Sequence, residues 1–164
     1  MIRKGKAGKP TEFGKLVKIQ EAENQIVTHY EVYDQRPSDS ELLTPAIEKH
    51  IEQFGHAPHL AAADAGFFSA ANEARAEQLG VKRIAVPSQA TKSAERKQTQ
   101  KKRWFKKAQA WRTGCEGRIS ILKRRHGIHR SRYKGTDGMR RFVGLGVIAD
   151  NLHHIGTVLA ARKT

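Results

Sequence analysis

The segment HLAAADAGFFSAANEARAEQLG (residues 59–80), followed by KRIAVP (residues 82–87), decides the fold. Its first part is a short apolar run that ends at Asp64. A helix is then expected to begin after the N-cap candidate Ser69 and to end at Gly80. KRIAVP predicts a second strand. A strand, a helix and a strand in this order indicate a parallel pair joined by a right-handed crossover, which is typical of an α/β fold.

Asp64 is the first candidate for a functional carboxylate. It would lie at the carboxyl end of a strand, where open α/β sheets place their ligands. The alternative is that Asp64 only forms a turn together with Gly66. The apolar run does not separate these two interpretations.

A second acidic site is predicted in WRTGCEGRISILKRRHG (residues 111–127). If this segment is helical, Glu116 lies about 40° and Lys123 about 20° from Arg112 around the helix axis. An adjoining apolar stripe would hold the helix against a core and comprises Ala108, Trp111, Cys115, Ile119 and Leu122. A carboxylate between cations suits a metal ligand that acts on a phosphodiester, because Arg and Lys can hold the phosphate oxygens. The alternative is a surface helix whose Glu offsets neighbouring cations.

Taken together, the sequence motifs around the two sites resemble those of a known family of enzymes. Asp64 to Ser69 read Asp-x-Gly-Phe-x-Ser, and Glu116 follows inside Arg-x3-Glu-x6-Lys. These motifs resemble the second and third acidic motifs of bacterial insertion-sequence DDE transposases, and the nearer match is the group loosely assigned to unclassified insertion sequences. The family signature has a Tyr where this chain has Gln109, whereas Arg112, Glu116 and Lys123 match it.

The resemblance implies an RNase H-like α/β fold, with a mixed sheet flanked by helices and a C-terminal helix. Residues 1–164 would form part of the catalytic domain. The family carries its first catalytic Asp on the first strand of the fold, but residues 1–33 contain no Asp. The chain is therefore expected to be a C-terminal portion that lacks this strand, from an interrupted gene, an internal start or trimming. Asp34 and Asp39 are poor substitutes, since Ser38 and Glu41 predict a capping box there.

The activity implied by the resemblance is metal-dependent cleavage and joining of DNA strands. Asp64 and Glu116 would be the catalytic and metal-binding carboxylates, for Mg²⁺ or alternatively Mn²⁺. With one of three carboxylates missing, the chain alone is expected to be inactive. The alternatives are a non-catalytic basic nucleic-acid-binding module, kept as a regulator, and a remnant fragment.

Charge favours DNA as the partner. The whole chain has a net charge of +15. Residues 92–134 hold 16 Lys or Arg and two Glu, whereas the rest of the chain is nearly neutral. A polyanion partner explains such segregation better than a solvated face does, because phosphate contacts release counterions. The predicted partners are transposon-end DNA and another copy or a full-length transposase. The residues expected to bind DNA are Arg112, Lys123, Arg124, Arg125, Lys106, Lys107 and Trp104.

The remaining segments are predicted from local patterns. After a Gly- and Lys-rich lead at 1–14, a hairpin is expected with its turn at Glu23 and Asn24. A helix should run over 40–53 and end at Gly55, and residues 88–103 should form a mobile basic linker or an exposed helix. A loop and a helix over 139–161 should follow. The residues of this helix expected to face inward are Phe142, Leu145, Ile148, Leu152, Ile155 and Leu159.

Several classes of protein are disfavoured. Cys115 is the single cysteine, which excludes a disulfide framework within the chain. FVGLGVIA (residues 142–149) is too short to span a bilayer, so no membrane partner is expected. The histidines lack the spacing of a zinc site with paired cysteines. A bacterial cytoplasmic protein associated with the nucleoid is the expectation.

Overall fold

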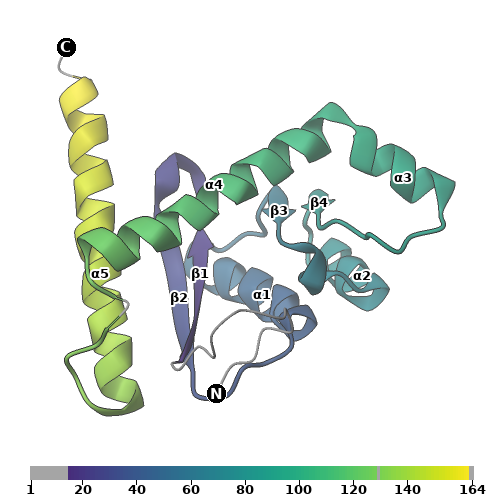
Figure 1. The fold of residues 1–164 in the computed structure, drawn as a ribbon. Helices are drawn as coiled ribbons and strands as arrows, with labels where there is room; N and C mark the ends of the chain where they lie inside the picture. The colour runs from purple at the N-terminus through teal and green to yellow at the C-terminus, as the bar shows by residue number, and fades with distance from the viewer. Residues whose placement is uncertain (1–14, 129, 163–164) are drawn as a thin grey trace, which may run out of the picture.

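The computed structural model describes residues 15–128 and 130–162; the lead at 1–14 lies outside the described residues. It has a mixed α/β architecture (Figure 1). The strands are β1 (Leu16–Glu21), β2 (Val27–Tyr33), β3 (Leu60–Ala62) and β4 (Arg83–Ala85). The α-helices are α1 (Leu43–Phe54), α2 (Ala70–Gln78), α3 (Ala94–Lys101), α4 (Arg103–Arg125) and α5 (Gly135–Ala161).

The strands form two separate ladders. β1 and β2 are antiparallel, with Leu16 opposite Tyr33, and they confirm the predicted hairpin. Asn24 and Gln25 turn the chain with φ of 59° and 62°. β3 and β4 are parallel, with Leu60 opposite Arg83, as the strand, helix and strand pattern predicted. Within the described residues, no ladder joins the two pairs, so the single mixed sheet that we expected is not formed.

The β3, α2 and β4 unit follows its local signals. The Ser69 side chain caps α2 by accepting from the Asn72 N–H at 3.0 Å. After the helix, Gly80 takes a φ of 97°, which disfavours residues with a side chain. Ala76, Ile84 and Val86 are buried in a core that also receives Leu43 and Ile47 from α1. This core holds the unit in place.

The helix α1 begins and ends close to the predicted residues. The capping box is present, because the Ser38 N–H donates to Glu41 Oε2 at 3.0 Å. The capped element is, however, a 3-10 turn at Asp39–Glu41, and α1 starts two residues later. Gly55 ends α1 with a φ of 74°. Phe54, the last residue of this helix, is exposed.

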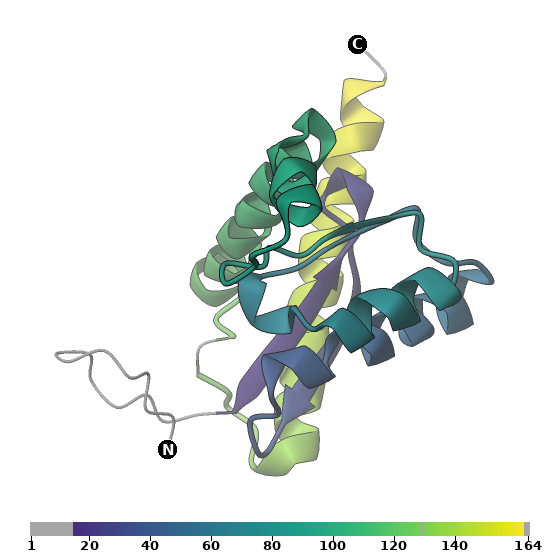
Figure 2. The ribbon, with the colours of Figure 1, turned by 90° about the vertical axis from the view of Figure 1, so that its right-hand side faces the viewer.

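Within the segment 88–103, Ala94–Lys101 form an exposed helix, which is the second of the two expected forms. The helix α3 is capped by Ser93 and contains no buried residue. Arg96 docks it, because its guanidinium donates to the Val86 carbonyl, pairs with Glu73 and lies 5.0 Å from the Phe68 ring centroid. In Figure 2, α4 lies on one side of the strands and α1 and α2 lie on the other.

The inward face of α5 differs from the prediction. Val143 and Val147 are buried against the hairpin, whereas Leu145, Ile148, Leu152, Ile155 and Leu159 are exposed. A Cβ at Gly144 would collide with the Tyr30 hydroxyl, and one at Gly146 would lie 2.7 Å from Ile128 Cγ2. These glycines permit a close approach, so α5 packs through its small residues and its larger apolar residues face outward.

By length and composition, α5 is long and apolar enough to cross a membrane, a feature that the shorter run FVGLGVIA did not predict. Its middle, however, carries Asp150, which is fully buried and ion-paired with Arg118 of α4. The packing of α5 against the hairpin and α4 accounts for its apolar inner residues.

Candidate active site at the strand ends

Gln109 positions α4 over the carboxyl ends of β3 and β4. Its side-chain amide donates to the Ala63 carbonyl at 3.2 Å and to the Ala85 carbonyl. Ala63 itself donates its N–H to Ala85 O at 3.3 Å, so the amide joins the two strand ends to the helix. In the sequence, Gln109 stands out only as a departure from the family signature. A polar side chain three residues before Arg112, on the inward side of the helix, was the available signal.

One turn further along α4, Arg112 lies between the two candidate carboxylates. Its Nη1 is 3.1 Å from Glu116 Oε1, and its Nη2 is 4.0 Å from Asp64 Oδ1. The Arg112 side chain is 20% exposed, whereas those of Asp64 and Glu116 are 64% and 61% exposed. Arg112 Nε is buried and has no hydrogen-bond partner among the described residues. The structure thus brings Asp64, Arg112 and Glu116 together, with both carboxylates open to solvent.

Asp64 also has a local role. Its Oδ1 accepts from the Ala65 N–H at 3.0 Å and caps a 3-10 turn at Ala65–Phe67. This capping is the turn-forming role that we considered as an alternative, and it leaves Asp64 Oδ2 without a hydrogen bond to any described residue. The carboxylate can therefore cap the turn and still present an oxygen to a ligand.

The other acidic residues considered from the sequence lie elsewhere. Asp34 pairs with Lys15 and accepts from Thr136 at 2.7 Å, and the hydrogen bond from Lys15 lowers the Asp34 pKa. Asp39 is 3.5 Å from Arg36 and packs against Gly66, beside the turn that Asp64 caps. Among the described residues, no group of three or more His, Cys, Asp or Glu side chains is placed to hold a metal.

Asp64 and Glu116, on either side of Arg112, are too few carboxylates for a two-ion site. Mg²⁺ is commonly bound by one or two carboxylates, with water and phosphate oxygens filling its other positions. A pair of ions about 4 Å apart needs more carboxylate oxygens than these two residues can share. A cation at this position would also compete with Arg112 for both carboxylates.

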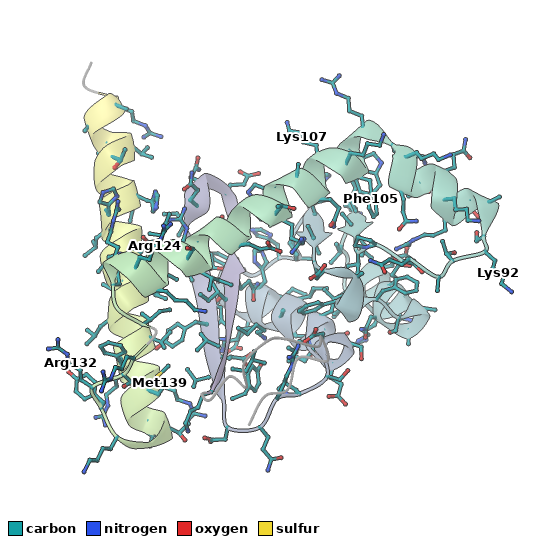
Figure 3. The ribbon with its side chains drawn as sticks, in the orientation of Figure 1. Lys92, Phe105, Lys107, Arg124, Arg132 and Met139 are labelled. Atoms are coloured by element: carbon teal, nitrogen blue, oxygen red, sulfur yellow. The ribbon has the colours of Figure 1, made fainter. Side chains whose placement is uncertain are left out.

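The residues predicted to bind DNA are spread along α4. Lys106, Lys107, Lys123, Arg124 and Arg125 are all exposed. In Figure 3, Lys107 points away from the strands, whereas Phe105 points toward them. Trp104 is partly buried beside Phe105, and the Arg83 guanidinium lies 5.5 Å from its ring centroid. These exposed cations lie along the length of the helix, and Trp104 is less accessible than they are.

The inward stripe of α4 is partly different from the prediction. Ala108 and Leu122 are buried as expected, but Trp111 and Ile119 are exposed. Arg118 is buried in place of Ile119. The prediction that Ile119 faces inward is therefore wrong, because a buried cation such as Arg118 is favoured only where charged partners surround it.

Those partners come from the hairpin and from α5. Arg118 Nη1 is 3.0 Å from Asp150 Oδ2, and Arg118 Nε is 3.3 Å from Glu21 Oε2. His126 Nε2 approaches the other oxygen of Asp150 at 3.3 Å, and Arg118 also contacts the His154 ring nitrogen. We call Glu21, Arg118, His126, Asp150 and His154 the buried ion cluster. It joins the hairpin, α4 and α5.

Cys115 borders the buried ion cluster. Its thiol lies 3.4 Å from Glu21 Oε1, and burial together with this carboxylate raises the pKa of Cys115 to about 12. A thiol with so high a pKa is a poor nucleophile at neutral pH. This agrees with the structural role that the sequence suggested.

Comparison with known proteins identifies the family. A family model described as a transposase DDE domain matches residues 72–155, which include Arg112 and Glu116 and begin after Asp64. The comparisons with curated proteins and with solved structures found no match. The matched region spans more than half of the 164 residues, and the chain therefore belongs to the transposase DDE domain family.

Proposed function

We propose that this chain is the C-terminal part of the catalytic domain of a bacterial insertion-sequence transposase. It would act on transposon-end DNA in the cytoplasm, in association with the nucleoid. The observation that carries the proposal is the placement of Asp64 and Glu116 on either side of Arg112 at the strand ends. The family match adds support for a role in transposition.

Each residue of this site has a proposed task. Transposase DDE domains generally use a divalent metal, and Asp64 and Glu116 would hold one Mg²⁺ or Mn²⁺ ion. The ion supplies charge neutralisation at a phosphodiester. Arg112 would then exchange its carboxylate partners for a phosphate oxygen, while Gln109 keeps the helix fixed on the strand ends. Lys123, about two turns beyond Glu116 along α4, would contact a more distant phosphate.

We further propose that the chain alone does not cut DNA. Asp64 and Glu116 have no third carboxylate close enough among the described residues to complete a two-ion site. The two separate strand pairs support the same proposal, because an additional strand between β1 and β3 would join them into one RNase H-like sheet. Such a strand could bring the missing Asp.

A non-catalytic DNA-binding role is the second candidate. The exposed cations of α4 favour it, because they require no metal to bind a polyanion. A chain that binds transposon ends without cutting them would inhibit a full-length transposase. The two candidates differ in whether divalent ions bind at Asp64 and Glu116.

The proposed protein partner is a second copy or a full-length transposase. Five large apolar side chains of α5 are 46–62% exposed and follow one another at intervals of three and four residues, namely Leu145, Ile148, Leu152, Ile155 and Leu159. Such spacing forms the contact stripe of a coiled coil. Sedimentation of wild-type protein and of Leu152→Glu tests this proposal. We expect an oligomer that the substitution dissociates, and a wild-type monomer would contradict it.

Titration with Mn²⁺ tests the metal site directly. We expect one weak ion per chain, with binding lost in Asp64→Asn and in Glu116→Gln. Glu48→Gln is the matched control, because Glu48 is also an exposed carboxylate paired with an arginine, Arg75, at 3.2 Å. Equal Mn²⁺ binding by all four proteins would reject the site and favour the non-catalytic role.

A nicking assay with Mg²⁺ or Mn²⁺ tests the inactivity. We expect no cleavage by the chain alone, and cleavage once an Asp-bearing upstream segment is supplied. Cleavage by the chain alone that disappears in Glu116→Gln would mean that it already holds its first carboxylate. Asp39, beside Gly66, would then be the first residue to substitute, followed by Asp34.

A further inference from the structure

A second site lies at the other end of α4. The last turn of α4, residues 126–127 and 130–133, and the first half of α5 border an open cavity of about 1070 Å³. Its basic lining residues are Arg124, Arg125, Arg130 and Arg132, with His126. Cavities that bind small organic ligands commonly have volumes of about 300–1000 Å³, so this one is large enough for such a group.

The charge of the arginines in this cavity is uncompensated. No Asp or Glu lines it, and its four arginines form no ion pair within the described part of the chain. Elsewhere, Arg75, Arg96 and Arg118 each pair with a carboxylate. Guanidinium groups gathered without counter-charges repel one another, and a ligand with phosphate oxygens relieves this repulsion. The ligand should therefore be anionic.

The other wall of the cavity is aromatic and apolar. Tyr133 is 52% exposed, and its ring centroid lies 6.0 Å from that of Phe142. A Cβ at position 138 would lie 2.8 Å from Tyr133 Cβ, so Gly138 allows Tyr133 to pack closely on α5. Gly146 and Ala149 extend this wall along the helix. An aromatic wall beside guanidinium groups suits a base that stacks while its phosphate is held.

We propose that this cavity binds an unpaired nucleotide of a DNA strand. A base in duplex DNA has both faces covered by its neighbours, so only an unpaired base can stack on Tyr133. Figure 3 shows Arg124 where α4 crosses α5 and Arg132 on the loop beside α5, so the phosphates would be held from two elements. This inference rests on the proposed function, because it assumes that the chain acts on DNA.

The position of the cavity supports a strand that runs along α4. Arg124 is eight residues beyond Glu116 on the same helix, which corresponds to about 12 Å along its axis. One strand could therefore contact the candidate active site and place an unpaired nucleotide in the cavity. The cavity would hold the strand near a cut without taking part in the chemistry.

The test compares two DNA duplexes of equal length, one blunt and one with a four-nucleotide single-stranded extension, at the same salt concentration. We expect wild-type protein to bind the extended duplex more tightly, by roughly 5-fold or more, because stacking of one base contributes about 1–3 kcal/mol. Tyr133→Ala should abolish this preference without weakening the binding of the blunt duplex, and Tyr133→Phe should restore it.

Matched controls separate the cavity from the rest of the surface. Phe54→Ala removes another exposed aromatic ring, on α1, and should retain the preference. Arg132→Gln should reduce the preference, whereas Arg141→Gln, an exposed arginine of α5 outside the cavity, should not. The assignment to the cavity would be overturned if Phe54→Ala lost the preference as much as Tyr133→Ala does. It would also be overturned if Arg141→Gln reduced the preference as much as Arg132→Gln does. Thermal unfolding of each variant confirms that it is folded.

The outcomes also separate this inference from the proposed function. Equal binding of both duplexes by wild-type protein would overturn the cavity site while leaving DNA binding intact. No binding of either duplex would overturn both. A free deoxynucleoside monophosphate is the last probe. We expect that the monophosphate, added at the concentration of nucleotides that the extension supplies, does not displace the extended duplex. Displacement would assign the cavity to free nucleotides in place of a DNA strand.

Discussion

Two charged regions of α4 are separated by only a few residues but have opposite surroundings. Asp64 and Glu116, beside Arg112, have side chains that are more than 60% exposed. Arg118 and Asp150 of the buried ion cluster are 4% and 0% exposed. Exposed ion pairs contribute little to stability, whereas removing one partner of a buried pair is costly. This difference indicates that Asp64, Arg112 and Glu116 can exchange one another for a ligand. The buried ion cluster instead keeps the hairpin, α4 and α5 together.

The largest expected effect is on the buried ion cluster. Asp150→Ala would leave Arg118 buried without its nearest carboxylate on α5, so we expect the free energy of unfolding to fall by about 3–5 kcal/mol. Asp137→Ala is the control, because Asp137 lies on the same helix in an exposed pair with Arg140 and should cost about 1 kcal/mol or less. Urea denaturation measures both. Similar losses would contradict the contrast between the two regions.

The exposed cations of α4 should affect DNA binding but not stability. Substituting Lys106 and Lys107 with Gln should weaken binding to random duplex and lower the slope of log affinity against log salt by up to about 0.9 for each lysine. Lys49 and Lys82, outside the basic segment, serve as the control pair. Binding titrations from low to moderate salt measure the slope. A salt response equal to that of the wild type would place DNA elsewhere on the molecule.

The close approach of α5 to the hairpin offers a third test. Gly144→Ala would force the new methyl group against Tyr30, and we expect a loss of about 1–3 kcal/mol in the free energy of unfolding. Nothing lies within 4 Å of a Cβ at Gly156, so Gly156→Ala should instead stabilise the helix by up to about 1 kcal/mol. Thermal denaturation distinguishes them. Stabilisation by both substitutions would show that helix propensity alone determines their effect on the free energy of unfolding.

The smallest expected effect depends on pH. Burial lowers the pKa of His154, and the Arg118 guanidinium lowers it further. The folded protein therefore favours the neutral ring. The contribution of His154 to stability is complete above the unfolded-state pKa of about 6.5, and it is lost as the pH falls from there through the lower folded-state pKa.

His154→Gln should thus weaken the decline in stability between pH 7.5 and pH 5. His153→Gln, at the exposed neighbouring position, is the control and should leave the decline as in wild-type protein. Denaturant midpoints at the two pH values measure the change. A steeper decline in His154→Gln would show that protonation of this ring favours the folded state.

Local signals in the sequence determined the elements that lie close together along the chain. The Ser69 cap, the turn glycines Gly55 and Gly80, and the apolar runs before Asp64 and at Ile84 predicted the end of α1 and the β3, α2 and β4 unit. Such signals act within a few residues and do not depend on distant partners. The acidic motifs also indicated the family, which the match over residues 72–155 established.

Only the tertiary structure decided which faces of α4 and α5 turn inward. Arg118 is buried because Glu21 and Asp150 meet it from positions 97 and 32 residues away, and no periodicity within α4 records those partners. In α5, the large apolar stripe was the stronger periodic signal, but the glycine side packs inward because it allows the closest approach to Tyr30 and Ile128. The hydrogen bonds from Gln109 to the strand ends also depend on the tertiary structure, because they join residues that become neighbours only after folding.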